Sequence, residues 1–71
     1  MVIMDIKLKL TKHADDKRRL EGITIDQIKT AIKRGSISKQ TDGFLAHYSY
    51  IRVAYKKIGK NVYKIKTVFV V

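Results

Sequence analysis

The chain has 71 residues, no cysteine, and 16 Lys and Arg against 6 Asp and Glu, which gives a net charge of +10. This length leaves room for one hydrophobic core, so residues 1–71 are predicted to form a single domain. The hydrophobic fraction of 45% is typical of a folded protein and excludes a disordered basic tail. Two histidines without cysteine cannot form the usual structural zinc site, and we expect neither a metal nor a cofactor.

Charged residues interrupt the apolar stretches of the chain. Asp5, Lys7 and Lys9 divide the first ten residues, where a signal peptide would need a continuous apolar run. No apolar run is longer than the four residues of Val68–Val71, and no predicted helix contains an aromatic anchor for a membrane surface. The absence of cysteine fits a reducing compartment. The sequence therefore predicts a cytoplasmic protein without a membrane partner.

Residues 2–10 alternate between apolar and polar side chains, which predicts a half-buried strand. The apolar face of this strand consists of Val2, Met4, Ile6, Leu8 and Leu10. Thr11 then suits the N-cap of a helix that Gly22 ends in the left-handed conformation. Only Ala14 and Leu20 are apolar interior residues of this first helix.

The second predicted helix runs from a capping-box pair, Thr24 and Gln27, to Gly35. Ile23 is placed to pack against Ile28 as a hydrophobic staple. Basic residues fill the last turn, where positive charge suits the helix dipole. The inward stripe of this helix consists of Ile25, Ile28, Ala31 and Ile32.

The remainder of the chain predicts strands. Ser36–Thr41 is a short polar strand, Asp42–Gly43 a turn, Phe44–Lys57 a strand, Ile58–Asn61 a hairpin connection and Val62–Val71 the last strand. The predicted order is β-α-α-β-β-β. This order indicates an α+β fold in which two helices pack on one face of a small antiparallel sheet.

Alternation in the last two strands separates apolar from basic positions. Ile51, Val53 and Tyr55 alternate with Arg52, Ala54 and Lys56. In the last strand Lys64 and Lys66 share one face, and the opposite face carries Tyr63, Ile65, Thr67, Phe69 and Val71. If the helices cover the apolar face, the open face carries Tyr50, Arg52, Lys56, Lys64 and Lys66. Cations interleaved with an aromatic ring predict a platform for single-stranded nucleic acid. The alternative is that these lysines only solvate an exposed sheet.

His13, Lys17 and Glu21 share one face of the first helix, where a histidine beside a lysine suits proton transfer. The alternative is a surface histidine next to an ordinary surface ion pair. His47, in an aromatic-rich strand, is interpreted as structural. The sequence has no phosphate-binding glycine loop, nucleophile elbow or metal-ligand cluster. The remaining His, Lys, Arg and Tyr side chains suit a metal-independent ribonuclease, in which the RNA 2′-hydroxyl is the nucleophile.

Three segments together resemble the domain of unknown function 4258 family. The first is TKHADDKRRLEGI at Thr11–Ile23, followed by the capped helix to Gly35. The others are IRVAY at Ile51–Tyr55 and KTVF at Lys66–Phe69. Where that family has two helical arginines, this chain has Lys17, which keeps the charge, and Glu21, which reverses it. The family is in turn similar to the RelE/ParE-type toxins.

The resemblance implies a RelE/ParE-like domain and a toxin-type endoribonuclease that acts on messenger RNA, on the ribosome. It implies a small acidic or ribbon-helix-helix antitoxin as partner. It also implies a catalytic set of His13, Lys17, Arg52 and Thr67. In this set His13 transfers the proton, while Lys17 and Arg52 stabilise charge.

Two further expectations concern the sheet residues. Lys56, Lys64 and Lys66 would contact phosphates, and Thr67, which shares the parity of Ile65 and Phe69, would point at the helices and position the first of them. Two other functions remain open. One is a non-catalytic basic module that binds a nucleic acid or an acidic partner, and the other is a toxin-shaped scaffold that only pairs with an antitoxin-like protein.

Overall fold

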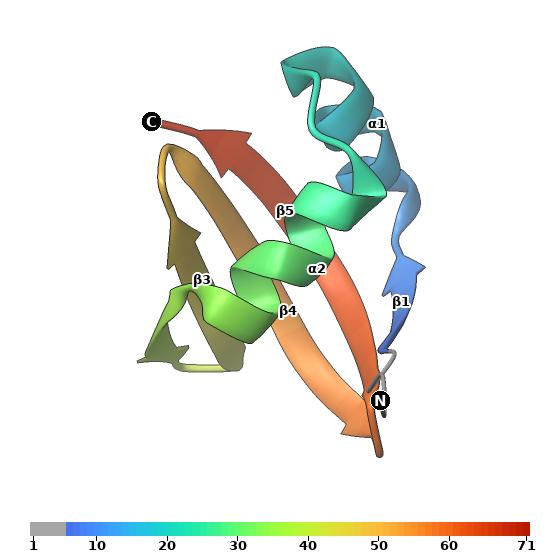
Figure 1. The fold of residues 1–71 in the computed structure, drawn as a ribbon. Coiled ribbons are helices and arrows are strands. Elements are labelled where there is room, and N and C mark those ends of the chain that lie inside the picture. Colours follow the sequence, from blue (N-terminus) through green and yellow to red (C-terminus); the bar gives the residue numbers. More distant parts are fainter. Residues whose placement is uncertain (1–5) are drawn as a thin grey trace, which may run out of the picture.

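The computed structural model describes residues 6–71, which form two helices and a five-stranded sheet in an α+β arrangement (Figure 1). The elements in chain order are β1 (Lys7–Leu10), α1 (Lys12–Glu21), α2 (Ile25–Arg34), β2 (Ser36–Gln40), β3 (Gly43–Tyr48), β4 (Ile51–Gly59) and β5 (Val62–Val70). The first part of the strand predicted over residues 2–10 lies outside the described residues. The α+β class predicted from the sequence is confirmed.

The sheet has the strand order β1-β5-β4-β3-β2 and is mixed. Strands β2 to β5 pair antiparallel, but β1 pairs parallel to β5, so the prediction of a purely antiparallel sheet is wrong at this pair. The helices and three strands that separate β1 from β5 let the two run in the same direction. Alternating hydrophobicity carries no information on strand direction, because its period is the same in both kinds of pair.

The segment predicted as one strand over Phe44–Lys57 is two strands, which gives five strands where four were expected. Ser49 and Tyr50 form the turn between them, with Tyr48 paired to Ile51 and Ser49 at φ 54°. Turns of this kind usually carry Asn or Gly at positive φ, so the serine at this position did not indicate a turn. The next hairpin turns at Lys60 and Asn61, within the predicted connection, and Asn61 has φ 57°.

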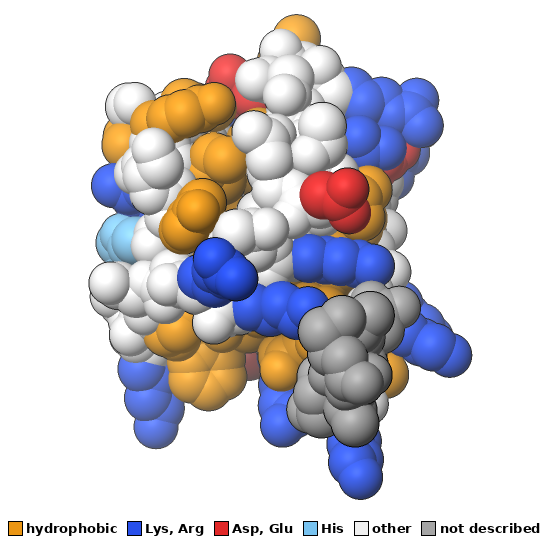
Figure 2. Space-filling model, viewed as in Figure 1, with side chains coloured by type: hydrophobic (Ala, Val, Ile, Leu, Met, Phe, Trp, Pro, Cys, Tyr) orange, Lys and Arg blue, Asp and Glu red, His pale blue; other side chains and the backbone are white. Residues whose placement is uncertain are grey.

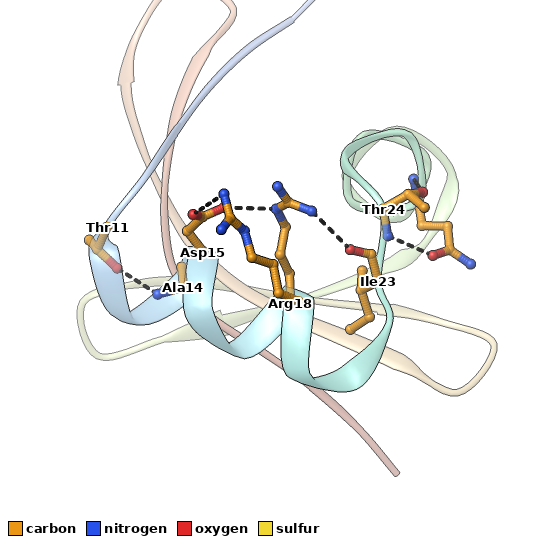
Figure 3. A network of polar contacts seen from close by, with 8 residues as sticks. Thr11, Ala14, Asp15, Arg18, Ile23 and Thr24 are labelled. Carbon is orange, nitrogen blue, oxygen red and sulfur yellow. Dashed lines mark hydrogen bonds and ion pairs between the residues drawn. The ribbon is translucent and has the colours of Figure 1, made fainter.

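Both helices begin and end where the sequence predicted. The Thr11 hydroxyl accepts a hydrogen bond from the Ala14 amide (3.0 Å), and Gly22 ends α1 with φ 72°. In α2 the Gln27 amide donates to the Thr24 hydroxyl (3.1 Å), while the Thr24 amide donates to Oε1 of Gln27 (2.8 Å). This reciprocal capping box satisfies two backbone donors that the helix itself leaves unpaired (Figure 3).

Arg18 joins α1 to the link between the helices. Its Nε donates to Oδ1 of Asp15 (3.0 Å), and its Nη1 donates to the carbonyl oxygen of Ile23 (3.5 Å) (Figure 3). Arg19 contacts the other oxygen of Asp15 at 3.2 Å. Both arginines therefore form ion pairs with Asp15 of the same helix.

A single buried cluster joins both helices to one face of the sheet. It consists of Ile6, Ala14, Ile23, Ile28, Ala31, Ile32, Ala46, Ile51, Val53, Tyr55, Ile65 and Val68. Leu20, predicted as an interior residue of the first helix, is instead 80% exposed. It follows the buried Ala14 by six positions, which is about 240° around the helix, so it points away from the sheet.

An irregularity between β4 and β5 reverses the alternation of β5. Ala54 pairs with Thr67 whereas Tyr55 pairs with Ile65, so Lys66 is an additional residue in β5. Ile65 and Val68 are both fully buried. Thr67 therefore belongs to the face that points away from the core, as does Phe69, contrary to the parity predicted for both residues.

Candidate nucleic-acid interface

The face of the sheet away from the helices collects cations from three strands. Ile51, Val53 and Tyr55 point into the core, so Arg52 and Lys56 between them point to the opposite face. Register then adds Lys64, the partner of Lys56, and Lys9, the partner of Lys64. We call this set the basic face; it consists of Lys7, Lys9, Arg52, Lys56, Lys64 and Lys66. The open cationic face predicted from alternation is thus present.

The middle of this face is apolar. Leu45 pairs with Ala54, and Phe69 pairs with Arg52; the three apolar side chains are half-buried. Phe69 is therefore the aromatic ring among the cations. Tyr50, predicted for that place, lies in the β3–β4 turn and lines a hollow with α2 on the other side of the sheet.

His13 and Thr67 meet at the edge of the basic face. His13 Nε2 lies 3.1 Å from the Thr67 hydroxyl. The start of α1 is fixed beside β5, because the Thr11 amide donates to the Ile65 carbonyl (3.2 Å) and the Thr11 hydroxyl to the Lys66 carbonyl (3.3 Å). Thr67 thus contacts the first helix, as the sequence predicted, although it does so from the face opposite to the one expected.

The other two residues of the predicted catalytic set occupy different surroundings. Arg52 and Thr67 are diagonal neighbours on β4 and β5, about 7–8 Å apart along the sheet. The Arg52 Nη1 donates to the carbonyl oxygens of Ser49 (2.8 Å) and Ile51 (3.0 Å). Lys17 lies one turn after His13 and pairs with Glu21 at 3.5 Å. The structure therefore joins His13 to Thr67, places Arg52 on the same face and leaves Lys17 with Glu21.

Asp42, in the turn before β3, is a part of the site that the sequence did not indicate. Its carboxylate lies 3.2 Å from Lys56 Nζ and 3.5 Å from Lys66 Nζ, and Lys66 also donates to its main-chain oxygen. The hydrogen bond and charge of Lys56, and then the charge of Lys66, hold the pKa of Asp42 below its usual value. The contact is strongest above that lowered pKa and is lost as the pH falls through it. Two of the phosphate-binding candidates are therefore partly neutralised.

The position of Asp42 depends on the glycine that follows it. Gly43 has φ 116°, and a Cβ there would collide with the carbonyl oxygen of Tyr55. Only glycine fits this combination of dihedral angle and close approach. His47 also lies on the basic face, paired in register with Arg52, and its Nε2 is 3.2 Å from the Ser38 hydroxyl. The structural role of His47 stays a prediction.

Comparison of the chain with protein-family models, with curated proteins and with solved structures gives no match. Within residues 6–71, no group of three His, Cys, Asp or Glu side chains could hold a metal ion. Nor does this part of the chain contain a helix that is long and apolar enough to cross a membrane. The function is therefore inferred from the residues and their geometry.

Proposed function

We propose that this chain is a cytoplasmic RNA-binding protein related to the RelE/ParE-type toxins, and that the basic face binds single-stranded RNA. The observation that carries the proposal is that cations from β1, β4 and β5 lie together on the face of the sheet that neither helix covers. Among the described acids, Asp42 is the one that forms ion pairs with this set. A face of this sign attracts phosphates over a distance comparable to the Debye length, about 8 Å at physiological salt.

Single-stranded RNA suits this face better than a duplex does. A strand has unstacked bases that can pack on an aromatic ring while the phosphates contact cations at the sides. Phe69 and the apolar pair Leu45 and Ala54 provide the packing surface, with Arg52 opposite Phe69 and the lysines further along β4 and β5. The phosphates of an RNA duplex would meet the lysines, but its stacked bases could not reach Phe69.

The pair His13–Thr67 supports metal-independent cleavage as the activity of this face. His13 Nε2 lies 3.1 Å from the Thr67 hydroxyl; in the tautomer whose Nε2–H donates to that hydroxyl, Nδ1 carries the lone pair and takes the proton of an RNA 2′-hydroxyl. The 2′-oxygen then attacks the adjacent phosphorus. The bond from phosphorus to the 5′-oxygen breaks, that oxygen takes a proton from water, and His13 returns its proton to the solvent. The products are a 2′,3′-cyclic phosphate and a 5′-hydroxyl, and Arg52 stabilises the charge that develops on the phosphate.

RNA affinity should fall steeply with salt. About four to six phosphate contacts give a slope of log K against log salt of roughly −3 to −4 on a single strand. Fluorescence anisotropy with a labelled nine-residue oligouridine, over a range of NaCl, measures this slope. The double variant Lys64→Ala, Lys66→Ala should lower its magnitude by about 1.4, which is two contacts. Lys33→Ala, at the exposed end of α2, is the matched control, and a flat response of the wild type would contradict RNA binding.

Asp42→Asn should raise the affinity for oligouridine. In the free protein Asp42 forms ion pairs with Lys56 and Lys66. A phosphate must therefore displace the carboxylate before the phosphate contacts either lysine. Without the carboxylate both lysines are available, and we expect a gain of about two- to fivefold, the size of one surface ion pair. Asp16→Asn makes the same change of charge on the exposed surface of α1 and is the control. Equal gains in both variants would show that only net charge matters.

The second candidate is a module that binds an acidic protein segment without cleaving RNA. The half-buried apolar part of the basic face, between Arg52 and the lysines, would suit an amphipathic acidic segment of an antitoxin-like protein. Such a partner, small and acidic or of the ribbon-helix-helix type, would compete with RNA for the same surface. If an adjacent gene encodes an acidic protein, that protein can be co-expressed with the chain, and its competition with RNA in the anisotropy assay would support this partner.

A further inference from the structure

A hollow lies between the first turns of α2 and the β3–β4 turn, on the side of the sheet opposite to the basic face. Its volume is about 410 Å³, within the range of small-molecule sites. Asp26, Gln27 and Thr30 line it from α2, and Tyr48 and Tyr50 line it from the turn. Figure 2 shows apolar side chains gathered at the upper left, over this end of the sheet. The role proposed above makes no use of this site.

Two polar groups of the hollow are available to a ligand. The capping box holds Oε1 of Gln27 with the Thr24 amide at 2.8 Å, which leaves the Gln27 amide nitrogen as a donor. The Thr30 hydroxyl donates to the main-chain oxygen of Asp26 (2.9 Å) and not to its carboxylate. Among residues 6–71 no side chain forms an ion pair with Asp26. The hollow therefore presents a carboxylate acceptor beside an amide donor.

Two aromatic rings border these polar groups. Tyr48 is 37% exposed and Tyr50 is 52% exposed, both unusually open for rings beside a core. The turn that carries them is fixed, because the Val71 amide donates to the Tyr50 carbonyl oxygen at 3.0 Å. Exposed rings on a fixed turn form a stacking surface for a planar group.

We infer that this hollow binds a guanine base of the RNA that lies on the basic face. The Watson–Crick edge of guanine has two adjacent N–H donors next to a carbonyl oxygen. A carboxylate accepts both donors in a bidentate pair, and the Gln27 amide can donate to the oxygen. Adenine, cytosine and uracil lack the adjacent donor pair. The inference rests on the proposed RNA binding and adds a base preference to it.

Arg52 connects the hollow to the basic face. Its guanidinium extends from the basic face to the carbonyl oxygens of Ser49 in the turn and Ile51 at the start of β4, and both residues line the hollow. A strand that passes Arg52 thus reaches the rim of the hollow, where its next base can turn inward. A net charge of +10 attracts this polyanion and repels cationic ligands. Asp26 repels phosphate, so it contacts the edge of a base.

The test compares four nine-residue RNAs that carry G, A, C or U between two flanks of four uridines. In anisotropy titrations at one salt concentration we expect the wild type to bind the G-containing RNA about tenfold more tightly than the other three. Asp26→Asn should abolish this ratio. Asp16→Asn, an exposed acid on α1 with the same change of charge, should retain it. A preference that persists in Asp26→Asn would overturn the guanine site.

Failure of the guanine site and failure of RNA binding give different results. Equal affinity of the wild type for all four RNAs overturns the guanine site and leaves RNA binding intact. If no RNA binds at low salt, the proposed function is wrong, and guanosine alone then tests the hollow. Selective NMR shifts of Tyr48 and Tyr50 with guanosine, but not with adenosine, would support it. The absence of these shifts would overturn the guanine site. So would binding of an arginine amide in the hollow, if Asp26→Asn abolishes that binding.

Discussion

His13→Ala should lower the rate of RNA cleavage about 10²–10⁴-fold, the usual contribution of one general base. The affinity for RNA should hardly change, because the variant keeps every lysine and arginine of the basic face. The side chain is exposed at the edge of the basic face, so its loss does not disturb the core. Single-turnover cleavage of end-labelled RNA in EDTA, with the cyclic-phosphate product identified, measures the effect.

Two further variants separate proton transfer from binding and from positioning. Lys64→Ala with Lys66→Ala should weaken binding while bound RNA reacts at the wild-type rate, since phosphate contacts position the strand. Thr67→Val keeps the shape of the side chain and removes the hydroxyl that holds His13. Its rate should fall less than that of His13→Ala, with a displaced pH–rate profile, which is the signature of a positioning residue.

The test that decides whether the chain is a ribonuclease includes ribosome-bound message as substrate. If wild type and His13→Ala degrade free and ribosome-bound message equally, including no degradation by either, then the chain is not a ribonuclease. The basic face would then remain as a binding surface for RNA or for an acidic protein.

The helices could be predicted almost to the residue because their signals are local. Thr11 and Thr24 each cap a helix through an amide three residues away, and Gly22 and Gly35 end the helices. These hydrogen bonds form within one turn and need no tertiary contact. The basic face could also be predicted, since Arg52 and Lys56 alternate with buried residues of the same strand.

The composition of the site depends on pairings that a single sequence does not encode. The additional residue at Lys66 exists only in register with β4, and it moves Thr67 and Phe69 to the basic face. The turn at Ser49 lacks the usual turn residues, and it removes Tyr50 from that face. His13 and Thr67 are 54 positions apart, and their contact requires α1 to lie beside β5. Most cations of the site could thus be named, but not Asp42 or Phe69, nor the arrangement of the residues.

Ile28→Ala should lower the free energy of unfolding by about 2–4 kcal/mol, the usual cost of such a truncation in a core. Ile28 is a fully buried residue of α2 and packs in the cluster that joins this helix to the sheet. A domain of this size has a total stability of roughly 4–10 kcal/mol, so the loss is a large part of the whole. It corresponds to a fall in melting temperature of about 10–25 °C, which thermal unfolding followed by circular dichroism measures.

Ile37→Ala is the matched control for this prediction, because it removes the same atoms from a side chain that is 45% exposed on the edge strand β2. It leaves no cavity, so the melting temperature should move by only a few degrees. Equal shifts in the two variants would contradict the packing of α2 described above.

Guanosine binding in the hollow beside α2 gives an independent check of this packing, since Asp26 and Gln27 of the hollow belong to the same helix. If Ile28 anchors α2, Ile28→Ala at a temperature below its transition should weaken guanosine binding, whereas Ile37→Ala should not.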